Sequence, residues 1–126
     1  MLVGETPGEQ EDVQGRPFVG PAGALLDEAL EGAGLARDDV YVTNAVKHFK
    51  WEASGKRRLH AKPSAREIQA CHPWLAAEIE AIRPGLILCL WATAAQTLLT
   101  KEFRLIQSYG GLLNSSWPDR VLNPSD

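Results

Sequence analysis

The chain has 126 residues and carries 13 lysines and arginines against 16 aspartates and glutamates, a formal net charge of −3. This length fits one domain with a substantial core, and the net charge excludes a surface that binds polyanions throughout. No run of about 18 apolar residues is present, so we expect no membrane span, and the N-terminus lacks the pattern of a secretory signal. Two cysteines, Cys71 and Cys89, are too few for a disulfide framework and favour a reducing, cytoplasmic setting.

The first part of the chain predicts strand, loop, helix and strand in that order. Residues 2–3 end a short strand, and residues 4–20 are rich in Gly, Pro and acids, which predicts a loop. Proline suits the first position of a helix and glycine its end, and apolar residues at helical spacing predict a helix over residues 21–34. Residues 40–43 predict a short buried strand that ends at Asn44.

The second part predicts a helix, a strand and another helix. Ser64 and Glu67 have the spacing of a capping box that opens a helix, and Pro84 ends it. Residues 86–90 are a continuous apolar run, typical of a strand that is covered on both faces. Residues 92–99 predict a helix, and weaker strand signals follow from Phe103 onward.

This order of elements predicts a three-layer α/β/α sandwich with a mainly parallel central sheet. Ligands in such sheets bind beyond the carboxyl ends of the strands. Glu5, Asn44 and the segment 45–63 all follow predicted strand ends. We therefore expect them to converge on one crevice.

The segment 45–63, predicted to be a long loop, concentrates positive charge. Between Lys47 and Lys62 there are six lysines and arginines and one acid, a local net charge of +5 that leaves −8 on the rest of the chain. Such asymmetry indicates a local anion site, and long loops in compact domains are usually functional. A solvated loop with chance clustering explains the charge run equally well. His60 ends the basic segment Lys56-Arg57-Arg58-Leu59-His60.

Two segments carry a resemblance to a known family. Gly4-Glu5-Thr6-Pro7-Gly8, followed by Glu11-Asp12 and by residues 15–23, resembles the first motif of the family 4 uracil-DNA glycosylases, and Thr43-Asn44-Ala45-Val46-Lys47 resembles the segment of their base-reading asparagine. The segment at 56–60 is similar to that of the UdgX branch, which excises uracil and stays attached to the abasic site through a loop histidine. The resemblance extends to about Leu99 and implies one uracil-DNA glycosylase-like domain over residues 1–126, incomplete at both ends.

The resemblance implies roles for particular side chains. Glu5 would stabilise positive charge on the sugar and His60 would be the nucleophile, both as catalytic residues. A uracil flipped out of the stack would be bound by Gly4, Thr6, Asp12, Phe18 and Asn44. Flanking phosphates would be held by Lys56, Arg57 and Arg58. The implied partner is uracil-containing DNA, single-stranded by preference, bound by a monomer.

The resemblance also implies a 4Fe–4S cluster. Two of its ligand positions are occupied here by His48 and Cys71, and histidine replaces cysteine as an iron ligand in Rieske centres. The family's other two cysteines precede the first strand. Because a cluster needs four ligands and only two candidates are present, we expect no stable cluster in this chain alone. Cys89, in the buried strand, is interpreted as core packing.

Plainer interpretations remain open for the main candidates. Phe18 can be an ordinary core residue, Asn44 can cap a turn, Glu5 can be an exposed loop acid, and His60 can contact a phosphate or be solvated.

The sequence also allows two other functions. A non-catalytic module could bind single-stranded nucleic acid through residues 47–62, with Trp51 as a stacking platform. A nucleotide-binding α/β domain is the third hypothesis, and neither a P-loop nor a G-x-G-x-x-G motif follows a strand to support it.

Overall fold

The computed structural model describes residues 1–98, and three short parallel strands form the central sheet of this part. β1 (Leu2–Gly4) lies between β2 (Val42–Asn44) and β5 (Leu88–Cys89). The last residues of β1 and β2 lie opposite each other in register. Because the strands are parallel, their carboxyl ends meet at one edge of the sheet, which is where ligands bind in such folds.

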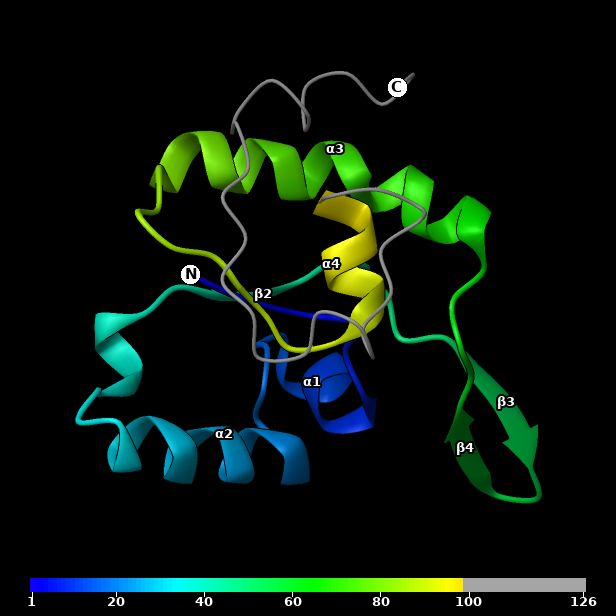
Figure 1. The fold of residues 1–126 in the computed structure, drawn as a ribbon. Helices are drawn as coiled ribbons and strands as arrows, with labels where there is room; N and C mark the ends of the chain where they lie inside the picture. The colour runs from blue at the N-terminus through cyan, green and yellow to red at the C-terminus, as the bar shows by residue number, and fades with distance from the viewer. Residues whose placement is uncertain (99–126) are drawn as a thin grey trace.

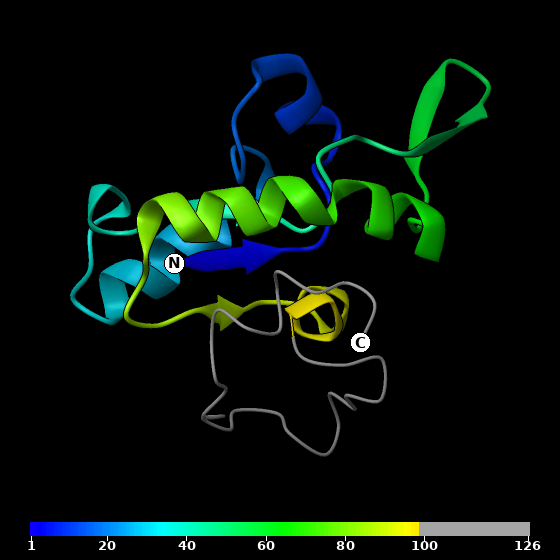
Figure 2. The same ribbon diagram turned by 90° about the horizontal axis from the view of Figure 1, so that it is seen from above.

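Helices cover both faces of this sheet (Figure 1). Alternate side chains of β1 point to opposite faces, so Leu2 packs against apolar side chains of α2 (Pro21–Gly32). Val3 packs on the other face against α3 (Ala65–Ile82) and α4 (Ala92–Leu98). Figure 2 shows α3 running along the direction of β1 when the molecule is seen from above. The predicted three-layer α/β fold is confirmed.

The two long helices begin where the sequence predicts. A proline occupies the first turn of α2. At the start of α3, the Glu67 backbone N–H donates to Ser64 Oγ at 3.2 Å, and the Ser64 backbone N–H donates to Glu67 Oε2 at 2.7 Å. α3 ends at Arg83, which has a left-handed backbone (φ +49°) and directly precedes Pro84.

The predicted loop over residues 4–20 contains a short helix, α1 (Glu9–Gln14). Three acids, Glu9, Glu11 and Asp12, lie in its first turn. Negative side chains stabilise the positive end of a helix dipole, which favours a helix at this place. A 3₁₀ turn, η1 (Arg37–Asp39), precedes β2.

The expectation of a continuous loop over residues 45–63 is wrong, because this segment contains a β-hairpin. β3 (Trp51–Ser54) and β4 (Arg57–His60) pair antiparallel through a two-residue turn. Gly55 opens the turn at φ +61°, and glycine is the residue that a type II′ hairpin turn requires there. The hairpin projects from the sandwich (Figure 1).

The last predicted strand differs in length and in burial. Residues 86–90 contribute only the two residues of β5, and Leu88 is 52% exposed, so burial on both faces is not observed. The strand signals from Phe103 onward lie outside the described residues. Among residues 1–98, no helix is both long and apolar enough to cross a membrane.

Candidate active site

The amide of Asn44 and the ring of Phe18 approach each other over Gly4. A Cβ atom added to Gly4 would lie 2.4 Å from Asn44 Oδ1 and 2.6 Å from Phe18 Cζ, so only glycine fits between them. Asn44 is 6% exposed, and its Oδ1 has no hydrogen-bond partner within the described part of the chain. A buried acceptor without a partner costs about 1–3 kcal/mol. A ligand that offers an N–H group would satisfy it.

The turn that carries Phe18 is held by several contacts. Phe18 has φ +53°, a conformation that is uncommon for a residue with a side chain. The Arg37 guanidinium donates to the carbonyls of Pro17 at 2.7 Å and Phe18 at 2.9 Å, and pairs with Asp27 of α2 at 2.8 Å. A Cβ on Gly23 would lie 2.0 Å from the Phe18 carbonyl oxygen, so the turn lies directly on α2. The Phe18 side chain also packs against the core cluster beneath α2.

Glu5 follows β1 and is fixed by a residue far away in the chain. Its Oε2 accepts a hydrogen bond of 2.5 Å from Thr93 Oγ1, at the start of α4. Thr93 is buried and Glu5 is half-buried. The carboxylate is therefore oriented at the carboxyl edge of the sheet and is not a freely solvated loop acid.

The hairpin brings His60 to the same loop. Its Nε2 lies 2.7 Å from Thr6 Oγ1, a hydrogen bond whose donor depends on the histidine tautomer. The Phe49 ring lies beside the imidazole, with 6.2 Å between the ring centroids. Because Thr6 directly follows Glu5, His60 contacts the residue next to the other predicted catalytic residue in the chain.

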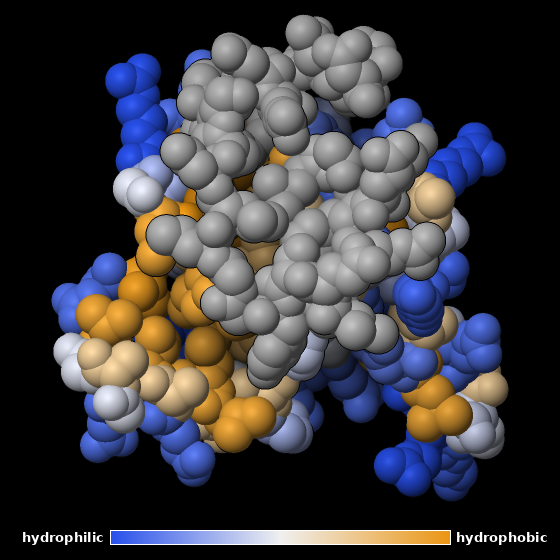
Figure 3. Space-filling model, viewed as in Figure 1, coloured by the Kyte–Doolittle hydropathy of each residue, from blue (hydrophilic) through white to orange (hydrophobic). Residues whose placement is uncertain are grey.

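Half of the cations in the basic segment form ion pairs within the protein. Lys47 pairs with Glu78, and Lys50 pairs with Glu67 at 3.2 Å. Figure 3 shows hydrophilic surface over the hairpin. Within residues 1–98, no ion pair involves the exposed cations Lys56, Arg57 and Lys62.

Arg58 is the third paired cation, and its partners lie on α1. Its Nε lies 3.1 Å from Glu9 Oε1, and its Nη1 lies 3.2 Å from Asp12 Oδ2. Asp12 is exposed, and its ion pair with Arg58 directs it toward the hairpin. The predicted role of Asp12 at the base stays a prediction.

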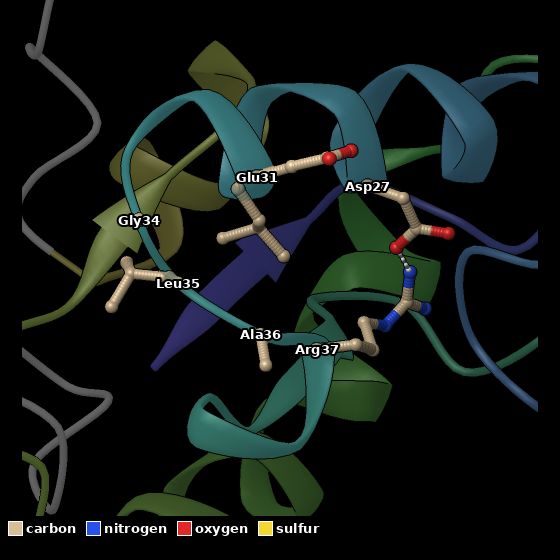
Figure 4. Close-up of a pocket in the computed structure, with 7 residues that line it drawn as sticks. Asp27, Glu31, Gly34, Leu35, Ala36 and Arg37 are labelled. Atoms are coloured by element: carbon tan, nitrogen blue, oxygen red, sulfur yellow. Dashed lines mark hydrogen bonds and ion pairs between the residues drawn. The ribbon is translucent and has the colours of Figure 1, made fainter.

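Two open cavities lie beside the Phe18 turn. One, of about 520 Å³, lies between α2 and η1, and the Arg37–Asp27 ion pair lines it (Figure 4). The other, of about 560 Å³, reaches the back of Phe18. Neither is lined by Glu5 or His60, so the chemistry of the candidate site lies elsewhere, at the carboxyl edge of the sheet.

Comparison with known proteins identifies the family of the chain. The family described as the uracil DNA glycosylase superfamily matches residues 1–124. The chain belongs to this superfamily. The type-4 uracil-DNA glycosylase of Archaeoglobus fulgidus is 41% identical over 114 residues, which cover 88% of this chain and 54% of the relative. That of Thermotoga maritima is 46% identical over 94 residues, or 75% of this chain and 45% of the relative.

A more distant similarity reaches a second type within the superfamily. The type-5 uracil-DNA glycosylase of Pyrobaculum aerophilum is 33% identical over 114 residues, covering 79% of this chain and 47% of the relative. The chain spans about half the length of the curated relatives that it matches.

The described residues contain only part of the ligand set that a 4Fe–4S cluster needs. The buried Cys71 Sγ accepts the Lys47 backbone N–H at 3.4 Å, and the exposed His48 is the next residue along the chain. Across residues 1–98, no three or more His, Cys, Asp or Glu side chains form a group that could hold a metal ion. These residues therefore do not fit a four-ligand cluster.

Cys89 adds no ligand to this pair. It packs against the core cluster, as predicted, and burial raises the pKa of its thiol to about 11, so it stays protonated near neutral pH.

Several residues of the candidate site were missed by sequence reasoning. Thr93 orients Glu5 from 88 residues away, and the Arg37–Asp27 pair fixes the Phe18 turn. The only local signal for Thr93 was its place just after an apolar strand, where side chains reach the ligand-binding edge. Nothing in the local sequence pointed to Arg37.

Lys47 connects the end of β2 to α3 and thereby supports Asn44. Its ammonium donates to the Asn44 carbonyl at 2.6 Å and to Thr43 Oγ1 at 2.8 Å, and it pairs with Glu78. The Tyr41 hydroxyl donates to Glu78 Oε2 at 2.7 Å. Burial alone would raise the pKa of Glu78, but hydrogen bonds from Lys47, Thr43 and Tyr41 lower it below its usual value. The hydrogen bond to Glu78, with burial, raises the pKa of Tyr41 to about 12.

We expect Tyr41→Phe to lower the free energy of unfolding at pH 7 by about 1 kcal/mol, because a hydrogen bond to a charged acceptor is lost. The raised pKa of Tyr41 stabilises the fold fully below pH 10, the ordinary tyrosine value, and the contribution is lost as pH rises toward about 12. Urea unfolding at pH 7 and pH 11 should therefore show a smaller difference between the variant and the parent at the higher pH. An equal difference at both values would contradict the linkage.

Proposed function

We propose that this protein removes uracil from DNA and then captures the abasic sugar covalently through His60, as in the UdgX branch. The observation that carries the proposal is the 2.7 Å contact between His60 Nε2 and Thr6 Oγ1, the residue that directly follows Glu5 in the chain. An ordinary glycosylase needs only water at this position. A histidine held near this loop by a separate hairpin offers a nucleophile that can replace water.

The base site is proposed at Gly4, Phe18 and Asn44. The Phe18 ring offers an aromatic face, and an amide can donate and accept hydrogen bonds along the Watson–Crick edge of uracil. The unpartnered Asn44 Oδ1 supports this, because the uracil N3–H group is a suitable donor. Thr6, in the loop after β1, and Asp12, on α1, are proposed to contribute to uracil binding.

The proposed reaction breaks the bond between the sugar C1′ and uracil N1, and the bonding electrons leave with uracil as an anion. The Glu5 carboxylate stabilises the positive charge that develops on the sugar. A neutral imidazole nitrogen of His60 donates its lone pair to C1′ and forms the new bond. The imidazole then loses its ring proton to solvent and the uracil anion takes one up, so that the products are free uracil and a histidine–sugar adduct.

Further parts of the proposal concern the partner and setting. The substrate is uracil-containing DNA, preferentially single-stranded, bound by a monomer in the cytoplasm. Lys56 and Arg57 are proposed to contact phosphates, because both are exposed and neither is used in an ion pair within residues 1–98. The family resemblance implies a 4Fe–4S cluster with His48 and Cys71 among its ligands, and because two ligands are too few, we expect no stable cluster in this chain alone.

A non-catalytic module for single-stranded nucleic acid is the second candidate function. Trp51 favours it, because this side chain is 46% exposed on the basic hairpin and bases stack on aromatic side chains.

One gel separates the two candidates. The protein is incubated with a uracil-containing single-stranded oligonucleotide and then denatured with SDS and heat, with free uracil measured in parallel. A thymine-containing oligonucleotide of the same sequence is the control. We expect a shifted band and free uracil only with the uracil substrate. Release without a surviving band would indicate a simple glycosylase, and neither signal would indicate a binding module.

DNA affinity should depend moderately on salt. Three cations that form no ion pair within residues 1–98 (Lys56, Arg57 and Lys62) predict a slope of log K against log salt of about 2, at ~0.7 for each neutralised phosphate on single strands. Arg57→Ala should reduce the slope by about 0.7 and weaken binding to all sequences equally. Fluorescence anisotropy with a thymine-only oligonucleotide measures both. An unchanged affinity at low salt would show that the hairpin does not contact DNA.

A further inference from the structure

Arg58 and His60 share one face of β4. Side chains alternate along a strand, so residues two apart point the same way. Both contact the loop and helix that follow β1: His60 through Thr6, and Arg58 through Glu9 and Asp12. Arg57 directly precedes Arg58 in the chain, and by the same alternation its exposed side chain lies on the opposite face. The two basic neighbours therefore have different surroundings.

The contacts of Arg58 join the hairpin to the body of the protein. Glu9 and Asp12 are three residues apart on α1, which puts both carboxylates on one side of the helix. The guanidinium reaches both, and it also lies over the rings of Phe49 and Trp51, 5.2 and 5.6 Å from their centroids. The Arg58 side chain thus connects α1 to β3, through Trp51, and to the segment before β3, through Phe49.

A hairpin of this size needs such support. Each strand has four residues, nearly all of them exposed, and an isolated two-stranded hairpin is marginally stable at best in water. The base of the hairpin is held by the pair between Lys50 and Glu67 of α3. Arg58 lies further along the hairpin, two residues from His60, and its ion pairs hold the hairpin against α1.

We propose that Arg58 is a positioning residue, which latches the hairpin onto α1 and so fixes the position of His60 for capture. This inference rests on the proposed function. Two carboxylates already surround the guanidinium, so it is less available to phosphates than the neighbouring Arg57. Cleavage of the glycosidic bond does not need the latch, because Glu5 is held by Thr93. Arg58 therefore governs the outcome after cleavage.

The measured quantity is the fraction of released uracil that is matched by SDS-resistant adduct. In Arg58→Ala this fraction should fall about tenfold or more, since a displacement of ~1 Å can cost about a hundredfold in rate. The rate of uracil release should stay within about twofold. Arg58→Lys, which keeps the charge but not the planar fork, should give an intermediate fraction.

Arg57→Ala is the matched control, because it removes the same charge from the adjacent position. It should weaken DNA binding and leave the captured fraction unchanged. An unchanged fraction in Arg58→Ala, or equal losses of release and capture, would overturn the assignment.

A second measurement does not depend on catalysis. Hydrogen exchange of the β3 and β4 amides should be faster in Arg58→Ala than in the parent, and unchanged in Arg57→Ala. If the parent forms no adduct, the proposed function fails, and the exchange data still test the latch. Equal exchange in the parent and Arg58→Ala would refute it.

Discussion

Replacement of His60 by serine is expected to abolish the covalent adduct while uracil release continues. The imidazole lies at the Glu5-Thr6 loop, so capture competes with water through a high effective concentration. Serine vacates the space, and water can then attack the sugar cation. The enzyme should change from a single-turnover trap to a hydrolytic glycosylase. The measurement is free uracil and SDS-resistant band from the same reaction. A band that persists in the variant would require another nucleophile, which peptide mapping would identify.

Glu5→Gln should instead depress release and capture together, by about a hundredfold or more. The glutamine oxygen can still accept the hydrogen bond from Thr93, so the variant removes the charge with little change of geometry. Charge stabilisation acts before the sugar is captured, and loss of one well-placed electrostatic group costs about 10²–10³ in rate.

Glu28→Gln on the exposed side of α2 is a suitable control, because it makes the same chemical change away from the site. It should leave both products at the parental level. If Glu5→Gln lost only the adduct and released uracil normally, the carboxylate would not be stabilising the cation.

Local sequence signals were sufficient for the main frame of the fold. The capping box at Ser64 and Glu67 opens α3 as predicted, and the order of strands and helices gives the parallel sheet. The convergence of Glu5 and Asn44 at one edge also follows from this order, because parallel strands carry their carboxyl ends to the same side.

The hairpin was not predicted, because its signals are weak locally. Its strands carry charged residues and show no clear alternation of apolar and polar side chains, and its turn is Gly-Lys, without the stronger Asn-Gly or Asp-Gly pattern. The hairpin is held against the body of the protein by tertiary contacts, since Arg58 forms ion pairs with residues more than forty positions away in the chain. Because these partners are distant in the chain, a count of charges along the sequence could not show that Arg58 is paired within the protein.

The Phe18 turn shows a further limit. A positive φ at a phenylalanine is disfavoured locally, and it persists here because Arg37 bonds to two carbonyls and Gly23 leaves room for the turn. Neither partner is recognisable without the fold. The motif residues around Phe18 indicated its chemistry, and only the structure indicates how the ring is held.

Gly4→Ala should reduce uracil release by about a hundredfold. The new Cβ would lie 2.4 Å from Asn44 Oδ1 and 2.6 Å from Phe18 Cζ. Both are the ends of side chains, which can move, so the fold should survive while the amide and the ring are displaced from the proposed base site. A displacement of ~1 Å at such a site costs about a hundredfold.

Gly32→Ala is the matched control for this substitution. A Cβ there meets no atom within 4 Å, and the residue lies at the end of α2, far along the chain from the sheet edge. Because alanine favours helix over glycine, this variant should be as active as the parent and more stable by about 0.5 kcal/mol. Single-turnover uracil release and thermal unfolding of both variants give the comparison. Normal release by Gly4→Ala with an unchanged melting temperature would show that Asn44 and Phe18 do not bind uracil, since the added methyl group must displace both side chains.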